Sequence, residues 1–173
     1  MTDVRSARDS DLAALVEIER SAGEAFRSLG MDRVADDDPG SAEQLAPYAE
    51  EGRAFVAVDH ADRPIAYLLL DLVDGNAHIE QVSVHPKHAG HGIGRELVEH
   101  AAAWAEQRGL PALTLTTYLD VPWNGPYYER LGFRHLGAGE ETPGLRALRA
   151  HERAVGLDAW PRGCMRRDLY VGR

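Results

Sequence analysis

The chain has 173 residues, of which 44% are hydrophobic, and both values are typical of one globular domain with a sizeable core. A formal net charge of −9 argues against a nucleic-acid partner. The sequence shows neither an apolar run long enough for a membrane helix nor a secretory leader, so we expect a cytoplasmic protein. The single cysteine, Cys164, excludes an internal disulfide bond and a cysteine-based metal site.

The first third of the chain predicts one strand followed by helices. Asp9 and Ser10 are N-cap candidates for a first helix that ends near Ala22, because apolar residues follow them at helical spacing. We expect the strand over residues 3–7. A short helix with a loop is expected over 23–40 and a further helix over 41–51.

The remainder of the chain changes to strands and then alternates helices with strands. Apolar runs predict strands over 54–58, 65–70 and 77–84, separated by polar turns. We then expect a long helix over 91–108, which Gly109 ends, and two shorter helices over 127–131 and 145–155. Strands are expected over 113–118, 133–137 and 164–171. This order predicts a single α/β domain, residues 1–173, whose mixed sheet carries helices on both faces.

A glycine-rich turn separates the strand that ends at Val84 from the long helix. Gly90, Gly92 and Gly94 stand at alternate positions there. The first N–H groups of a helix lack partners and lie at the positive end of the helix dipole, and glycines let an anion approach the backbone. This pattern is typical of a phosphate or pyrophosphate site.

Two sequence blocks together resemble the GNAT acyltransferase superfamily. The family turn Q/R-x-x-G-x-G/A corresponds to Ala89–Gly94, and a family segment N-x-x-x-Y-E-x-L-G-F is similar to Asn124–Phe133. The resemblance covers nearly the whole chain and is most specific over residues 78–134. It implies a mostly antiparallel sheet of about seven strands with two splayed parallel strands, and acetyl-CoA as cosubstrate. A dinucleotide-binding domain fits poorly, because this turn follows two hairpins rather than a first strand.

The resemblance also implies which residues bind coenzyme A. The backbone of the strand before the turn pairs with the pantetheine arm, and backbone N–H groups of the turn hold the pyrophosphate. Ala89 departs from the family's Gln or Arg, so its side chain contributes little. Asn124 either contacts the cofactor or caps a helix. The expected cofactor-binding residues are Val82, Val84, Ala89, Gly90, His91, Gly92, Ile93, Gly94, Arg95, Asn124 and Tyr127.

Acyl transfer to an amine requires a base and an acid, because a lysine-like amine with a pKa of about 10.4 is protonated at neutral pH. The resemblance makes Tyr128 the acid that protonates the departing thiolate; the alternative is a half-buried packing residue. Glu80 is the first candidate for the base and His78 the second, since residues two apart share one face of a strand. The alternatives for this pair are a solvated carboxylate and a structural hydrogen bond.

The histidines of the turn do not form a ligand set, since no carboxylate accompanies His85, His88 and His91 in a ligand-like pattern, and we expect no metal. The acidic run 36–38 is interpreted as a solvated loop. Residues expected to line the acceptor pocket are Glu19, Phe26, Tyr67, Tyr118 and Trp123.

The predicted function is acetyl transfer from acetyl-CoA to a small-molecule or peptide amine, by direct attack in a ternary complex. The alternative is an acyl-CoA-binding sensor or regulatory module without catalysis. The sequence does not identify the amine. The resemblance makes a homodimer one of the assemblies to expect.

Overall fold

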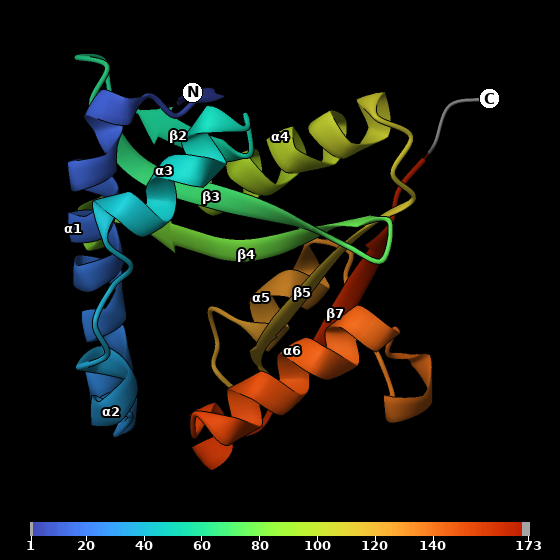
Figure 1. Ribbon diagram of the computed structural model, residues 1–173. Helices are drawn as coiled ribbons and strands as arrows, with labels where there is room; N and C mark the ends of the chain where they lie inside the picture. The colour runs from blue at the N-terminus through green and yellow to red at the C-terminus, as the bar shows by residue number, and fades with distance from the viewer. Residues whose placement is uncertain (1, 171–173) are drawn as a thin grey trace. The chain divides into compact units, whose positions relative to one another are not determined.

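The computed structural model describes residues 2–170, and Figure 1 shows their helices and strands. The chain divides into two compact units. One unit comprises Met1–Leu70 and Gln81–Ala101, and the other comprises Asp71–Glu80 and Ala102–Arg173. The strands form a 7-stranded sheet in the order β1-β2-β3-β4-β5-β7-β6. Its parallel pair is β4 with β5, and the described pairs around it are antiparallel. The predicted fold class is therefore confirmed, whereas the single domain stays a prediction.

The elements follow the predicted order with small differences at their ends. The strands are β1 Asp3–Ser6, β2 Ala54–Val58, β3 Pro64–Val73, β4 Asn76–Val84, β5 Ala112–Tyr118, β6 Arg134–His135 and β7 Arg162–Asp168. The helices are α1 Leu12–Gly23, α2 Asp32–Ala35, α3 Ala42–Glu50, α4 Ile93–Gln107, α5 Gly125–Arg130 and α6 Pro143–Ala154, with short 3₁₀ helices between them.

One predicted strand is much shorter than expected, whereas the long helix ends where it was expected to end. The strand expected over 133–137 is only two residues long, because Phe133 turns inward and its ring contacts that of Tyr128. Gly109 follows α4 with a φ of 69°, as expected of a helix-ending glycine. The last strand was expected to extend to Val171, which lies outside the described residues.

The first unit places helices on both faces of its strands. One face of β2 and β3 packs against α1 and α3 through an apolar cluster, and the other contacts α4, where Phe55 and His100 meet with ring centroids 4.7 Å apart. Successive side chains of β2 point to opposite faces of the sheet, and helices cover both faces, so all residues of β2 are buried. The cluster includes Leu12, Leu15, Ile18, Leu45, Val56, Val58, Tyr67 and Leu69.

The start of α1 corrects the predicted caps. Neither Asp9 nor Ser10 caps the helix; a 3₁₀ helix over Asp9–Asp11 precedes it instead. The Asp11 carboxylate is buried and accepts hydrogen bonds from the Arg8 backbone N–H at 2.7 Å and from the Arg5 guanidinium at 2.8 Å. The buried carboxylate with its arginine partner therefore fixes this turn.

A charged network holds α6 to two strands of the second unit. Glu152 accepts hydrogen bonds from Thr116 of β5 at 2.5 Å, from Arg149 at 2.7 Å and from Arg162 of β7 at 3.2 Å. Arg149 is 5% exposed and also binds both carboxylate oxygens of Asp158. Each charge in the network has an opposite charge in contact, as buried ions require.

Glu152→Gln should lower the free energy of unfolding by about 2 kcal/mol at neutral pH, because Arg162 loses its carboxylate partner and Arg149 keeps only Asp158. Burial alone would raise the pKa of Glu152, but Thr116 and the two arginines outweigh burial and leave that pKa below its ordinary value. A depressed carboxylate pKa stabilises the fold above the unfolded-state pKa of about 4.3, and the stabilisation is lost as the pH falls through the folded-state value.

Urea unfolding of the wild type and the variant from pH 7 to pH 3 measures this effect. The difference in unfolding free energy should shrink below about pH 4. Glu106→Gln, at an exposed position, is the matched control and should change stability by less than about 0.5 kcal/mol. A difference that is constant over the whole pH range would contradict the assignment.

Candidate functional site

The glycine turn before α4 is exposed from Ala89 to Gly92, whereas Ile93 and Gly94 at the start of the helix are buried. Gly90 and Gly92 have φ values of 80° and 76°, a left-handed backbone that favours glycine. No atom of the described chain lies within 4 Å of the position that a Cβ would take at either residue. The helix α4 begins at Ile93, so the N–H groups of its first turn have no partner within the helix. The turn therefore has free space beside Gly90 and Gly92, directly before these unpaired N–H groups.

The residues just before this turn are engaged with one another. His85 accepts a hydrogen bond through Nδ1 from the Lys87 backbone N–H at 3.2 Å and thereby caps the 3₁₀ helix Pro86–His88. Within residues 2–170, no three His, Cys, Asp or Glu side chains are grouped so that they could hold a metal ion. The turn thus offers main-chain donors for binding an anion.

The two base candidates lie close together on β4 but in different environments. His78 is 2% exposed, and its Nδ1 lies 2.8 Å from Oγ1 of Thr114 on the neighbouring parallel strand. Burial lowers the pKa of His78 despite the negative charges of Asp71 and Glu152, so the ring is neutral at pH 7. Glu80, two residues later, is exposed. Glu80 is accessible to a water molecule, whereas His78 is held inside.

The acid candidate lies in α5, packed between aromatic rings. Tyr128 is 8% exposed, and its ring centroid lies 5.6 Å from that of Phe133 and 5.4 Å from that of Tyr127. Burial raises the pKa of Tyr128 above its ordinary value. The hydroxyl therefore carries its proton at neutral pH and can donate it.

Asn124 precedes α5 but does not cap it, so the capping alternative is wrong. Its side chain makes no capping hydrogen bond, because Pro126 in the first turn has no N–H and the ψ of Asn124 is −110°, far from the extended value of a cap. Its Oδ1 atom is buried and has no hydrogen-bond partner among the described residues. A buried acceptor without a partner is a position where a ligand N–H would fit.

The glycine at the start of α5 fits against the backbone of the preceding loop. A Cβ at Gly125 would overlap the carbonyl oxygen of Leu119 and stand 3.0 Å from its carbonyl carbon. The Leu119 N–H donates to the Pro161 carbonyl at 2.9 Å, so this loop is itself held in place. Gly125→Ala should therefore cost about 1–3 kcal/mol of stability and displace α5 together with Tyr128.

Thermal unfolding and steady-state kinetics of Gly125→Ala measure both effects. Gly139→Ala is the control, because no atom lies within 4 Å of its added Cβ. A Gly125→Ala protein with unchanged melting temperature and unchanged kcat would show that the loop yields to the extra methyl group.

The order of elements, the open glycine turn and the tyrosine helix are together the features of one known family. The sequence matches the profile of the Acetyltransferase (GNAT) family over residues 13–133. The protein is a member of the GNAT acetyltransferase family.

Relatives of this GNAT protein are acetyltransferases of different substrates. It is 33% identical over 158 residues to the streptothricin acetyltransferase of Streptomyces lavendulae, covering 78% of this chain and 82% of that protein. It is 30% identical over 98 residues to the peptidyl-lysine N-acetyltransferase YjaB of Salmonella typhimurium, covering 57% of this chain and 61% of the relative. A solved structure of a PaiA N-acetyltransferase from Thermoplasma acidophilum in complex with coenzyme A shares the fold, with a TM-score of 0.70, 14% identity and coverage of 98% and 99%.

The residues expected to line an acceptor pocket fall into both units of the GNAT protein. Tyr67 and Glu19 are joined by a hydrogen bond of 3.3 Å in the first unit. Tyr118, in the second unit, is 5% exposed and lies under the Arg162 guanidinium at 4.3 Å, so its ring is not open to a ligand. Trp123 is 37% exposed.

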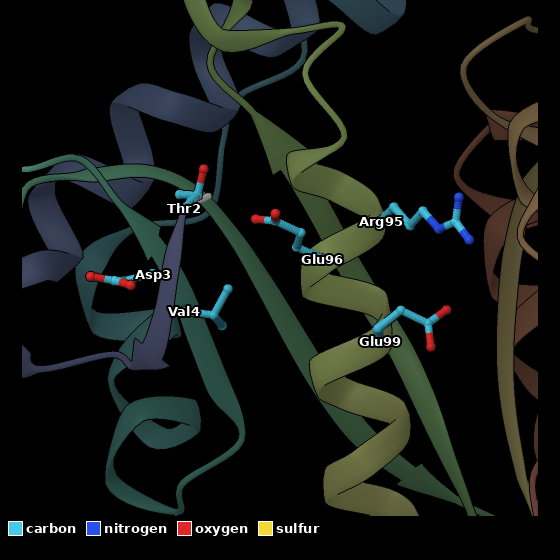
Figure 2. Close-up of a pocket in the computed structure, with 6 residues that line it drawn as sticks. All are labelled: Thr2, Asp3, Val4, Arg95, Glu96 and Glu99. Atoms are coloured by element: carbon cyan, nitrogen blue, oxygen red, sulfur yellow. The ribbon is translucent and has the colours of Figure 1, made fainter.

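A shallow hollow that the sequence did not suggest lies between β1 and α4 of the GNAT protein (Figure 2). It measures about 430 Å³, and Glu96 extends into it toward Thr2 whereas Arg95 points the other way. Its lining residues are Thr2, Asp3, Val4, Arg95, Glu96 and Glu99. Three carboxylates against one arginine do not suit a pyrophosphate, so this hollow is not the anion site.

The single cysteine of the GNAT protein lies in β7 and is buried. Cys164 is 2% exposed and donates to Glu141 at 3.3 Å, and burial together with that carboxylate raises the pKa of the thiol to about 12. It is therefore a packed thiol and not a nucleophile.

Within residues 2–170, no helix is both long enough and apolar enough to cross a membrane.

Proposed function

We propose that this GNAT protein transfers the acetyl group of acetyl-CoA to an amine by direct attack in a ternary complex. The observation that carries the proposal is the glycine turn before α4, where free space beside Gly90 and Gly92 adjoins the unpaired N–H groups of the first helical turn; this arrangement suits the pyrophosphate of coenzyme A. The unpartnered Oδ1 of Asn124 adds a second fit, since the pantetheine arm carries amide N–H groups.

Each group of the donor has a proposed partner in this chain. The N–H groups from Gly90 to Arg95 bind the pyrophosphate, with little help from the side chain of Ala89. The backbone of Val82 and Val84 pairs with the pantetheine arm, and Asn124 and Tyr127 are the other residues proposed to bind coenzyme A. Acetyl-CoA supplies an activated thioester, and the backbone near Val84 orients and polarises its carbonyl.

The amine must lose a proton before it attacks, and Glu80 is the proposed base. Because its carboxylate is exposed, Glu80 can accept the proton through a water molecule. His78 is the second candidate: its ring is neutral and can accept a proton, but it is buried against Thr114. We therefore assign His78 the lesser role.

The thiolate of coenzyme A needs a proton as the tetrahedral intermediate collapses, and Tyr128 is the proposed donor. Its raised pKa keeps the phenol protonated, and a phenol can donate to a sulfur anion. Burial between Phe133 and Tyr127 limits the rotation of the ring and so orients the hydroxyl.

The acceptor is proposed to be a primary amine, since named relatives act on peptidyl lysine and on streptothricin. Release of free thiol from acetyl-CoA, measured with a panel of peptides, polyamines, amino acids and antibiotics, tests the proposal. Turnover with at least one amine is expected. Tight binding of acetyl-CoA without transfer to any acceptor would instead support the non-catalytic acyl-CoA-binding module.

A further inference from the structure

A carboxylate of the first unit joins three segments that are distant in the sequence. Glu19 of α1 is half-buried, and its Oε2 accepts hydrogen bonds from the Gly40 N–H at 3.1 Å and from the Tyr67 hydroxyl of β3 at 3.3 Å. Both bonds use the same oxygen. The other oxygen, Oε1, takes part in neither bond and is left for a further donor.

This carboxylate has no cation to balance it. Within residues 2–170 no basic side chain forms an ion pair with Glu19: the adjacent Arg20 pairs with Glu17 at 2.8 Å, and Arg27 pairs with Asp36 at 2.5 Å. Burial is the main reason that the pKa of Glu19 is raised, and the negative charge of Asp37 adds to it. An ionised carboxylate kept in such a place costs folding free energy.

Residues that keep an unfavourable charge are candidates for ligand binding. The surroundings of Glu19 supply neutral donors on one oxygen and negative charge beside it, and both favour a cation at the other oxygen. An ammonium group, with three N–H donors and a compact charge, suits a single carboxylate oxygen.

We propose that Glu19 binds a second ammonium group of the acceptor, so that the preferred substrates are amines with two or more positive charges. The inference rests on the proposed function, because it concerns the acceptor of that reaction. It assigns Glu19 to specificity and leaves proton transfer to other residues. The exposed aspartates of residues 36–38 contribute a general negative field only.

Two acceptors of equal chain length test the inference: cadaverine, with two ammonium groups, and pentylamine, with one. Glu19→Gln should raise the KM for cadaverine about tenfold, as expected for the loss of one hydrogen bond between charged groups, and leave the KM for pentylamine and both kcat values within about twofold. Asp38→Asn is the matched control, since it removes one exposed negative charge from the loop that contains Gly40, and it should change every constant less than about twofold.

Equal effects of Glu19→Gln on the two acceptors would overturn the inference and leave the proposed function standing. Calorimetric titration of cadaverine into the wild-type protein measures binding at this site without turnover. Cadaverine should bind more weakly to Glu19→Gln. Cadaverine binding that is absent, or independent of Glu19, also overturns the inference. Cadaverine binding with no acetyl transfer counts against the proposed function alone. Glu19→Gln should fold at least as stably as the wild type at neutral pH, because it removes an unfavourable charge.

Discussion

Tyr128→Phe should lower kcat about 100-fold or more, while the Kd for coenzyme A stays within about twofold of the wild-type value. The substitution removes only the hydroxyl, so the ring contacts with Phe133 and Tyr127 remain. Loss of the proton donor leaves the thiolate to depart unaided. Stopped-flow or steady-state thiol release gives kcat, and calorimetry gives the affinity for coenzyme A.

Tyr48→Phe in α3 is the control for loss of a tyrosine hydroxyl elsewhere, and its kcat should not change. A Tyr128→Phe protein with full kcat would show that Tyr128 is a packing residue and that the proton comes from another group. A protein that loses coenzyme A affinity together with kcat would place the hydroxyl in binding rather than in proton transfer.

Gly92→Val should raise the KM for acetyl-CoA about tenfold or more, with a smaller effect on kcat. The φ of 76° at Gly92 is strained for a side chain, and the added carbons would fill the free space beside the turn. An anion would then be kept at a distance from its donors. Steady-state kinetics at varied acetyl-CoA and saturating amine measures the change.

Gly52→Val separates backbone strain from anion binding. Gly52 has a φ of 71° and no atom within 4 Å of an added Cβ, so the strain matches that at Gly92 while the position is away from the turn. Its KM for acetyl-CoA should not change. Ala89→Gln should leave that KM unchanged or lower it. A KM that rises equally in Gly92→Val and Gly52→Val would mean that the turn does not hold the donor.

Local patterns made most of the fold predictable. Alternation identified β2, β3 and β4, and helical spacing with Gly109 identified α4 and its end. The short β6 was not predictable from propensity, because the contact of Phe133 with Tyr128 overrides the strand pattern there. The failure of Asn124 to cap α5 could have been read from Pro126, which removes one N–H that a cap would bind.

The candidate site residues stay a prediction; sequence patterns indicated their positions along the chain but not the surroundings of their side chains. Positions of the glycine turn and of Tyr128 follow from motif spacing. The different exposure of His78 and Glu80 does not, since strand alternation gives the face of a residue but not what covers it. The link from Glu19 to Gly40 and Tyr67 joins residues 21 and 48 positions apart, which only the folded chain brings together.

The buried Cys164 has a practical consequence for every assay of this protein. Its thiol is 2% exposed and has a pKa near 12, so it should not react with aromatic disulfide reagents at neutral pH. The colour that such a reagent develops during turnover then comes from free coenzyme A alone, with no background from the folded protein. In denaturant the same reagent would label Cys164, so one dye can report both turnover and unfolding.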